Sequence, residues 1–125
     1  MIVDLRDNPG GLLDSVCDVL RKILPEGLIV YTEDKDGNRE EEKCDGKNEL
    51  RIPLAVLVNE SSASASEIFA GAVQDYGIGT IVGTTTYGKG VVQSIRQLSD
   101  GSAIKLTVAI HLREIILIKL GSNRI

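Results

Sequence analysis

The stretch NESSASASEIFAGAVQDY, residues 59–76, decides how the rest of the chain can be arranged. A strand-like segment ends at Asn59, four serines follow within six residues, and a helical pattern then begins. The first turn of a helix offers unpaired backbone N–H groups and the positive end of the helix dipole, which favour developing negative charge. A serine there could act as a nucleophile. Ser64 followed by Glu67 also matches a capping box that merely closes the helix end, and this stretch alone favours the cap.

On the N-terminal side, the sequence predicts a short strand, a tight turn and a helix in succession. Residues 1–5 are mostly apolar and predict the strand. Residues 6–11 read RDNPGG, a dense turn signal whose glycines let the backbone approach a ligand closely. Residues 12–24 predict a helix, which Pro25 and Gly27 terminate. Its apolar positions at helical spacing are Leu12, Val16, Val19, Leu20 and Ile23.

The remaining segments complete an α/β pattern. They are predicted as a strand at 28–32, a polar hairpin or flap over 33–49, strands at 54–59 and 80–83, and a hairpin of 91–98 with 102–110. Between the strands at 54–59 and 80–83 lies the helix of the opening stretch. This order predicts a mixed β-sheet with packed helices.

Length and composition bound the class of protein. A chain of 125 residues with 42% apolar content can bury one core, which predicts a single domain. The net charge of −4, with both signs mixed along the chain, leaves no basic stripe for nucleic acid. No apolar run approaches the length of a membrane span, and the N-terminus does not resemble a signal peptide.

Residues that often bind metals lack the spacing for it. Cys17 and Cys44 form no CxxC or Cys/His motif, so both are predicted to be structural. His111 has no partner motif and is read as an ordinary surface or edge residue. The acidic segment from Asp34 resembles a calcium loop, but Arg39 stands where that loop needs glycine, which favours a solvated loop. No metal or cofactor is expected.

The segment GTTTYGKG, residues 83–90, leaves two functional interpretations open, besides an ordinary solvated loop. It comes within one residue of a phosphate-binding P-loop, but Gly90 replaces the hydroxyl residue and a β-branched segment follows instead of a helix. Alternatively, Lys89 is the general base for a serine nucleophile. A lysine can act as a base only in its neutral form. Burial lowers the pKa of a lysine and favours that form, whereas an adjacent carboxylate opposes it. Residues 83–98 contain no acidic side chain.

Three ordered stretches together resemble one family. DLRDNPGG at 4–11, NESSASASEIFAGA at 59–72 and GTTTYGKGVVQ at 83–93 resemble the carboxyl-terminal processing peptidases, also called tail-specific proteases. The resemblance extends from about residue 2 to residue 109. It implies the α/β catalytic core of that family, similar in architecture to the Clp protease and crotonase group. It favours a nucleophile over a simple cap at Ser64, and a general base over a solvated loop residue at Lys89.

The resemblance implies a role for each matching residue. Ser64 is the nucleophile, Lys89, 25 residues later, is its base, and Gln93 orients the lysine. By the same resemblance, the oxyanion hole is formed by the backbone N–H group of Ala65 and that of Gly10 or Gly11. Glycine turns and helix N-termini can each present such a donor. The implied activity is a serine-type endopeptidase that cleaves near protein C-termini through an acyl-enzyme.

The chain also departs from the family pattern. Complete members carry a PDZ domain and further strands before the first motif, so residues 1–109 are expected to be a partial catalytic core. Residues 110–125 form an atypical tail, for which a frameshift near Ile110 is the hypothesis. An inactive fragment of such a peptidase is therefore the alternative function, and a P-loop-like nucleotide binder a remote one. Expected partners are C-terminal segments of protein or peptide substrates, and further copies of the chain through exposed strand edges. The resemblance suggests the cell envelope as the location.

Overall fold

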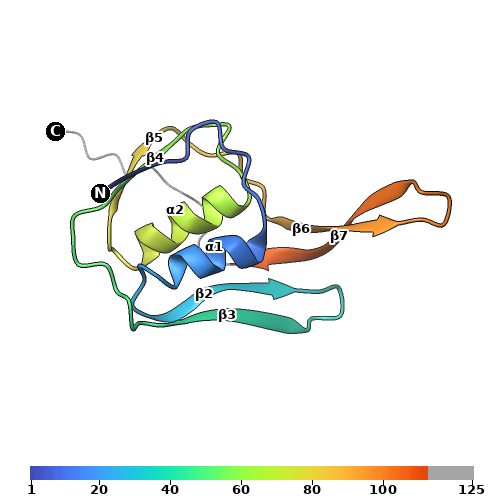
Figure 1. Cartoon of the computed structure of the whole chain (residues 1–125), viewed down its shortest axis with the longest axis horizontal. Helices are drawn as coiled ribbons and strands as arrows, with labels where there is room; N and C mark the ends of the chain where they lie inside the picture. The colour runs from blue at the N-terminus through green and yellow to red at the C-terminus, as the bar shows by residue number, and fades with distance from the viewer. Residues whose placement is uncertain (113–125) are drawn as a thin grey trace.

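Two β-sheets enclose two helices. The computed structural model describes residues 1–112, without the side chains of residues 92, 94, 95 and 108–112. The first sheet holds β1 (Ile2–Asp4), β4 (Ala55–Val58) and β5 (Thr80–Gly83). The second holds β2 (Glu26–Glu33), β3 (Arg39–Asp45), β6 (Val91–Gln97) and β7 (Ala103–Leu112). Helices α1 (Leu13–Leu20) and α2 (Ala65–Asp75) lie between the sheets (Figure 1).

The three-stranded sheet is entirely parallel, with the order β1-β4-β5. Val56 on β4 is in register with Val3 on one side and Ile81 on the other. All three strands therefore end at the same edge of the sheet. In open α/β sheets this carboxyl edge is where ligands bind. The three segments that follow these strands are the NPGG turn, the serine-rich loop and the GKG loop.

The helices and the parallel strands supply most of the hydrophobic core. Its fully buried apolar side chains include Leu20, Leu24, Ile29, Val30, Val56, Val58 and Val73. The predicted end of the first helix at Leu24 is wrong, because α1 ends at Leu20. The chain then tightens into turns, in which the N–H groups of Ile23 and Leu24 both donate to the Leu20 carbonyl oxygen, at 3.0 and 2.9 Å.

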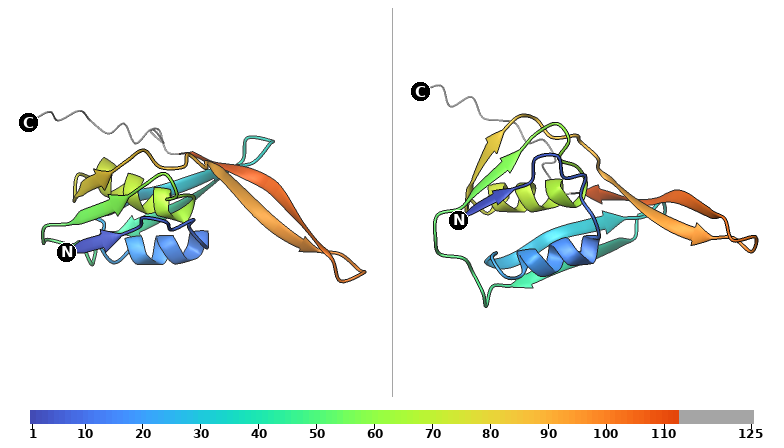
Figure 2. Two further views of the ribbon diagram at one scale, coloured as in Figure 1. Left: turned by 90° about the horizontal axis from the view of Figure 1, so that it is seen from above. Right: turned by 45° about the horizontal axis from the view of Figure 1, so that its top comes forward.

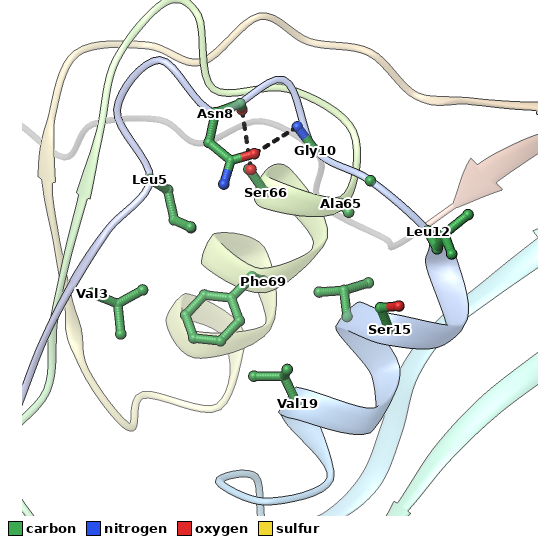
Figure 3. Close-up of a pocket in the computed structure, with 12 residues that line it drawn as sticks. Val3, Leu5, Asn8, Gly10, Leu12, Ser15, Val19, Ala65, Ser66 and Phe69 are labelled. Atoms are coloured by element: carbon green, nitrogen blue, oxygen red, sulfur yellow. Dashed lines mark hydrogen bonds between the residues drawn. The ribbon is translucent and has the colours of Figure 1, made fainter.

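Two of the five apolar positions at helical spacing are exposed. Leu12 is 74% exposed, because it precedes the first helical residue, and Val19 is 52% exposed. Both line an apolar cavity of about 280 Å³ between α1, the end of β1 and Phe69 of α2 (Figure 3). The other three predicted positions are buried.

The second sheet is antiparallel, with the order β3-β2-β7-β6. The strands of the predicted mixed sheet thus divide into one parallel and one antiparallel sheet. The polar hairpin is confirmed as β2 and β3, and its turn is closed by the Asp34 carboxylate, which accepts hydrogen bonds from Asp36 and Asn38. The second hairpin is confirmed as β6 and β7, which project from the body of the molecule (Figure 2).

Both cysteines are free and buried. Cys44 Sγ lies 3.4 Å from the Leu24 carbonyl oxygen, and burial raises the pKa of the Cys17 thiol to about 11. Both therefore have structural surroundings, as predicted. Leu112 and His111 pair with β2 through their backbones, but the prediction for the His111 side chain lies outside the described residues. The predictions for the tail from residue 113 onward also lie outside them.

Candidate active site

The loop between β4 and α2 gives Ser64 an unusual backbone conformation. Its φ of 55° and ψ of −118° lie in a region that non-glycine residues rarely adopt. Such strain persists only where the surroundings enforce it, and it concentrates at active sites. Serine nucleophiles of several hydrolases occupy a comparable strained turn between a strand and a helix. Ser64 is half-buried and immediately precedes α2.

The neighbouring serines are engaged in structural contacts. Ser62 is completely buried, and its hydroxyl donates to the Leu5 carbonyl oxygen at 2.7 Å. The Ser66 hydroxyl, which is also buried, donates to the Asn8 carbonyl oxygen at 3.1 Å. Ser61 is exposed and lines a neighbouring cavity, but it does not line the cavity that contains Ser64 and Ala65, the first residue of α2. Among the four serines of this loop, Ser64 is thus the one whose surroundings suit a nucleophile.

The NPGG turn after β1 packs directly on the serine-rich loop. The Asn8 carbonyl oxygen accepts the Ala63 N–H at 3.1 Å as well as the Ser66 hydroxyl (Figure 3). Gly10 has a φ of +95°, and a Cβ atom built there would lie 2.5 Å from the Ala63 carbonyl oxygen and 2.7 Å from the Ala65 nitrogen. Only glycine fits this contact.

The hydrogen bonds of this turn distinguish the predicted oxyanion donors. The Gly10 N–H donates to the Asn8 side-chain oxygen at 2.9 Å (Figure 3), so it is already used. Within residues 1–112, no hydrogen bond is recorded from the backbone N–H groups of Gly11 or Ala65. Both residues line the cavity that also contains Ser64. This arrangement favours Gly11 over Gly10 as the partner of Ala65.

The carboxylate of Glu67 joins the serine turn to the lysine loop. Its side chain is only 6% exposed and accepts four hydrogen bonds. They come from the Ser64 N–H at 2.9 Å, the Thr86 hydroxyl at 2.7 Å, the Gly88 N–H at 2.6 Å and the Lys89 N–H at 2.9 Å. Four donors satisfy the acceptor capacity of a buried carboxylate. One side chain therefore fixes the backbones of Ser64 and Lys89 relative to each other.

Ser64, Lys89 and Gln93 line one cavity of about 240 Å³. Lys89 is half-buried, and Gln93, on β6, is exposed. The two residues also line a second, larger cavity of about 660 Å³ on the side of Tyr87 and Glu60. Lys89 and Gln93 therefore lie where the two cavities adjoin, and Ser64 lines the smaller one.

Sequence reasoning missed the main role of Glu67. The capping box predicts its contact with Ser64, and the Ser64 N–H does donate to it. Its bonds to Gly88 and Lys89 depend on the tertiary fold, so no local pattern shows them. The strand character predicted after the GKG loop is confirmed, because β6 begins at Val91. A P-loop instead continues into a helix.

The pair Asp4 and Arg6 stabilises the strand end that leads into the NPGG turn. Two nitrogens of the Arg6 guanidinium donate to the Asp4 carboxylate at 3.0 and 2.7 Å. These bonds hold the pKa of Asp4 at about 2. The described side chains contain no cluster of three His, Cys, Asp or Glu residues that could hold a metal ion. Neither helix of residues 1–112 has the length and hydropathy needed to cross a bilayer.

Comparisons with known proteins agree on one family. The model of peptidase family S41 matches residues 1–115. A carboxyl-terminal-processing protease of Synechocystis sp. is 52% identical over 86% of this chain and 25% of its own length. Carboxyl-terminal-processing peptidase 3, chloroplastic, of Arabidopsis thaliana is 49% identical over 89% of this chain and 22% of its own.

A solved structure extends the similarity to three dimensions. The photosystem II D1 C-terminal processing protease superposes with a TM-score of 0.79 and 41% identity, over 89% of this chain and 29% of its own. The predicted α/β architecture is thus confirmed. The chain spans about a quarter of the length of the relatives it matches.

Proposed function

The chain belongs to peptidase family S41, and from that membership we propose that it is a serine-type endopeptidase that uses a Ser64/Lys89 dyad. In this proposal Gln93 orients the lysine, and the backbone N–H groups of Ala65 and Gly11 form the oxyanion hole. The observation that carries it is the Glu67 carboxylate, which binds the backbones of both dyad residues. A fixed separation between nucleophile and base is what proton transfer within a dyad requires.

The proposed reaction proceeds through an acyl-enzyme. Neutral Lys89 takes the proton from the Ser64 hydroxyl as its oxygen attacks the carbonyl carbon of the scissile peptide bond. The tetrahedral oxyanion is stabilised by hydrogen bonds from Ala65 and Gly11. The C–N bond then breaks, and Lys89 gives its proton to the departing amine. A water molecule, deprotonated by Lys89, hydrolyses the resulting ester and regenerates Ser64.

Labelling with a fluorophosphonate and locating the adduct by mass spectrometry tests this proposal. We expect one adduct, on Ser64, which is lost in Ser64→Ala and formed at least about a hundredfold more slowly in Lys89→Ala. Ser61→Ala is the matched control, because Ser61 is an exposed serine of the same loop. It should label at the rate of the unaltered chain. Absence of an adduct from folded protein, or an adduct on another serine, would contradict the dyad.

The second candidate is a catalytically inactive fragment of such a peptidase. It is favoured by the share of the relatives that the chain spans, which is about a quarter. A lysine base needs a dry pocket, and segments outside this chain could supply its walls. The same labelling separates the two candidates, because an inactive fragment that is folded gives no adduct at Ser64.

The proposed substrates are proteins cleaved near their C-termini. This proposal follows the names of the similar proteins, which process carboxyl termini. The cell envelope remains the proposed location from the family resemblance. Similar proteins occur in bacteria and, by their names, in chloroplasts. A proteome-wide comparison of new C-termini, with and without active protein, would identify the cleaved sequences.

A further inference from the structure

We propose that Lys105, which has no role in the dyad, binds a carboxylate of the substrate at one end of the cleft beside Ser64. This inference rests on the proposed peptidase function for the meaning of the cleft. The binding itself can be measured without catalysis.

The register of the β6–β7 hairpin directs Lys105 toward the site. Gln93 pairs with Thr107 across the hairpin, and Lys105 lies two residues from Thr107 on β7. Because side chains alternate along a strand, Lys105 is on the same face of the hairpin as Gln93. Both line the 240 Å³ cavity that contains Ser64 and Lys89. A residue outside the three family motifs thus lines the same cavity as the proposed dyad.

The charges around this cavity leave Lys105 without a protein counter-ion. Among the described residues that line it, none is acidic. Glu67 lies nearby, but its two oxygens already accept four hydrogen bonds. Lys105 forms no ion pair with any of the described carboxylates. Lys89 and Lys105 are the basic residues that line the cavity. Because the proposed reaction uses Lys89 for proton transfer, Lys105 is the one left to bind a ligand.

The adjoining cavity carries an acidic side chain. Beyond Lys89 and Gln93, the larger cavity is lined by Glu60 and by Tyr87, whose side chain is 70% exposed. An anionic group would be repelled at the Glu60 end and attracted at the Lys105 end. A bound peptide should therefore place a carboxylate near Lys105. That carboxylate is either the C-terminal α-carboxylate or an acidic side chain, and both can accept a charge-assisted hydrogen bond from the lysine.

Peptide binding to the chain with Ser64→Ala, which prevents turnover, tests the proposal. Fluorescence anisotropy would give Kd values for four labelled heptapeptides. Two are apolar and end in a free carboxylate or in an amide, and the other two carry Glu or Gln at an internal position. We expect a carboxylate to strengthen binding about five- to tenfold at low salt, and less at high salt. Lys105→Met should remove that advantage, and Lys105→Arg should keep it. Lys22→Met, at an exposed lysine outside the cleft, is the matched control.

The outcome identifies the source of the carboxylate. Loss of the difference between acid and amide peptides in Lys105→Met assigns the α-carboxylate, and loss of the difference between Glu and Gln assigns a side chain. If neither difference depends on Lys105, the proposal is overturned. Failure of the fluorophosphonate to label Ser64 would instead overturn the dyad alone, because binding is measured in a variant that cannot react.

Discussion

A single residue, Glu67, connects the two halves of the candidate dyad. Ser64 precedes α2 and Lys89 precedes β6, and each backbone N–H donates to the same carboxylate oxygen at 2.9 Å. Because this carboxylate is buried and accepts four donors, its removal would leave several backbone groups without a partner. The arrangement fixes the backbones of the proposed nucleophile and base relative to each other.

Replacing Glu67 with glutamine tests this connection. Glutamine has the same size, but its NH2 group cannot accept the hydrogen bonds that one carboxylate oxygen now receives. We expect Glu67→Gln to lower the free energy of unfolding by about 1–3 kcal/mol and to slow Ser64 labelling on the order of a hundredfold. Urea denaturation and fluorophosphonate kinetics measure the two effects.

The control for this variant is Glu60→Gln. The Glu60 side chain is exposed, and its carboxylate accepts a hydrogen bond from Thr84 at 3.1 Å. Stability and labelling of Glu60→Gln should remain close to those of the unaltered chain. Equal labelling rates in Glu67→Gln and Glu60→Gln would show that the buried carboxylate does not hold the dyad.

At the scale of elements, the site depends on the close packing of two turns. The NPGG turn approaches the start of α2 so closely that a side chain at Gly10 would overlap the backbone of Ala63 and Ala65. The neighbouring Gly11 is different, because a Cβ atom there would meet no atom within 4 Å. The two adjacent glycines therefore form a matched pair for mutagenesis.

We predict that Gly10→Ala disrupts the site and that Gly11→Ala leaves the fold intact. The alanine at position 10 must adopt a positive φ and displace the serine turn, which should cost about 1–3 kcal/mol of stability and slow Ser64 labelling at least about tenfold. Gly11→Ala keeps its backbone N–H, and its stability should change by less than about 0.5 kcal/mol. Thermal unfolding and labelling rates check both. Similar behaviour of the two variants would exclude this packing.

Most elements could be predicted because their signals are local. The strand ending at Asp4, the turn residues of NPGG and the polar hairpin around Asp34 each carry their own pattern. The predicted end of α1 is wrong, because i→i−3 hydrogen bonds from Lys22 to Val19 and from Ile23 to Leu20 end the regular helix before Pro25 is reached. The exposure of Leu12 and Val19 could not be predicted, because helical spacing shows a face but not what covers it.

At the scale of the whole molecule, the parallel order β1-β4-β5 is what assembles the site. Three motifs far apart in the sequence follow three strands that end at one edge, so the strand order makes them neighbours. The sequence motifs supplied candidates for the nucleophile and the base. Other features of the site depend on tertiary contacts that no local periodicity encodes. They are the hydrogen bonds by which Glu67 and Asn8 join separate loops, and the position of Lys105 beside the cavity.

The projecting β6–β7 hairpin exposes apolar side chains beside an edge of the antiparallel sheet. β6 is an edge strand of the antiparallel sheet, and the hairpin extends beyond the body (Figure 2). Ile104 and Leu106 are 41% and 46% exposed on β7, and alternation places them on the face opposite Lys105. Exposed apolar edges of this kind pair readily with other chains.

We therefore predict that the chain associates with itself through this hairpin as its concentration rises. Sedimentation velocity over a series of concentrations should show a shift from monomer to larger species. The double variant Ile104→Thr and Leu106→Thr should weaken this association about tenfold or more, because both changes replace exposed apolar surface by threonine, a β-branched residue that suits a strand. Val19→Thr, at an exposed apolar position on α1, is the matched control and should associate like the unaltered chain. Association that persists in the double variant, or that Val19→Thr weakens equally, would place the contact elsewhere on the molecule.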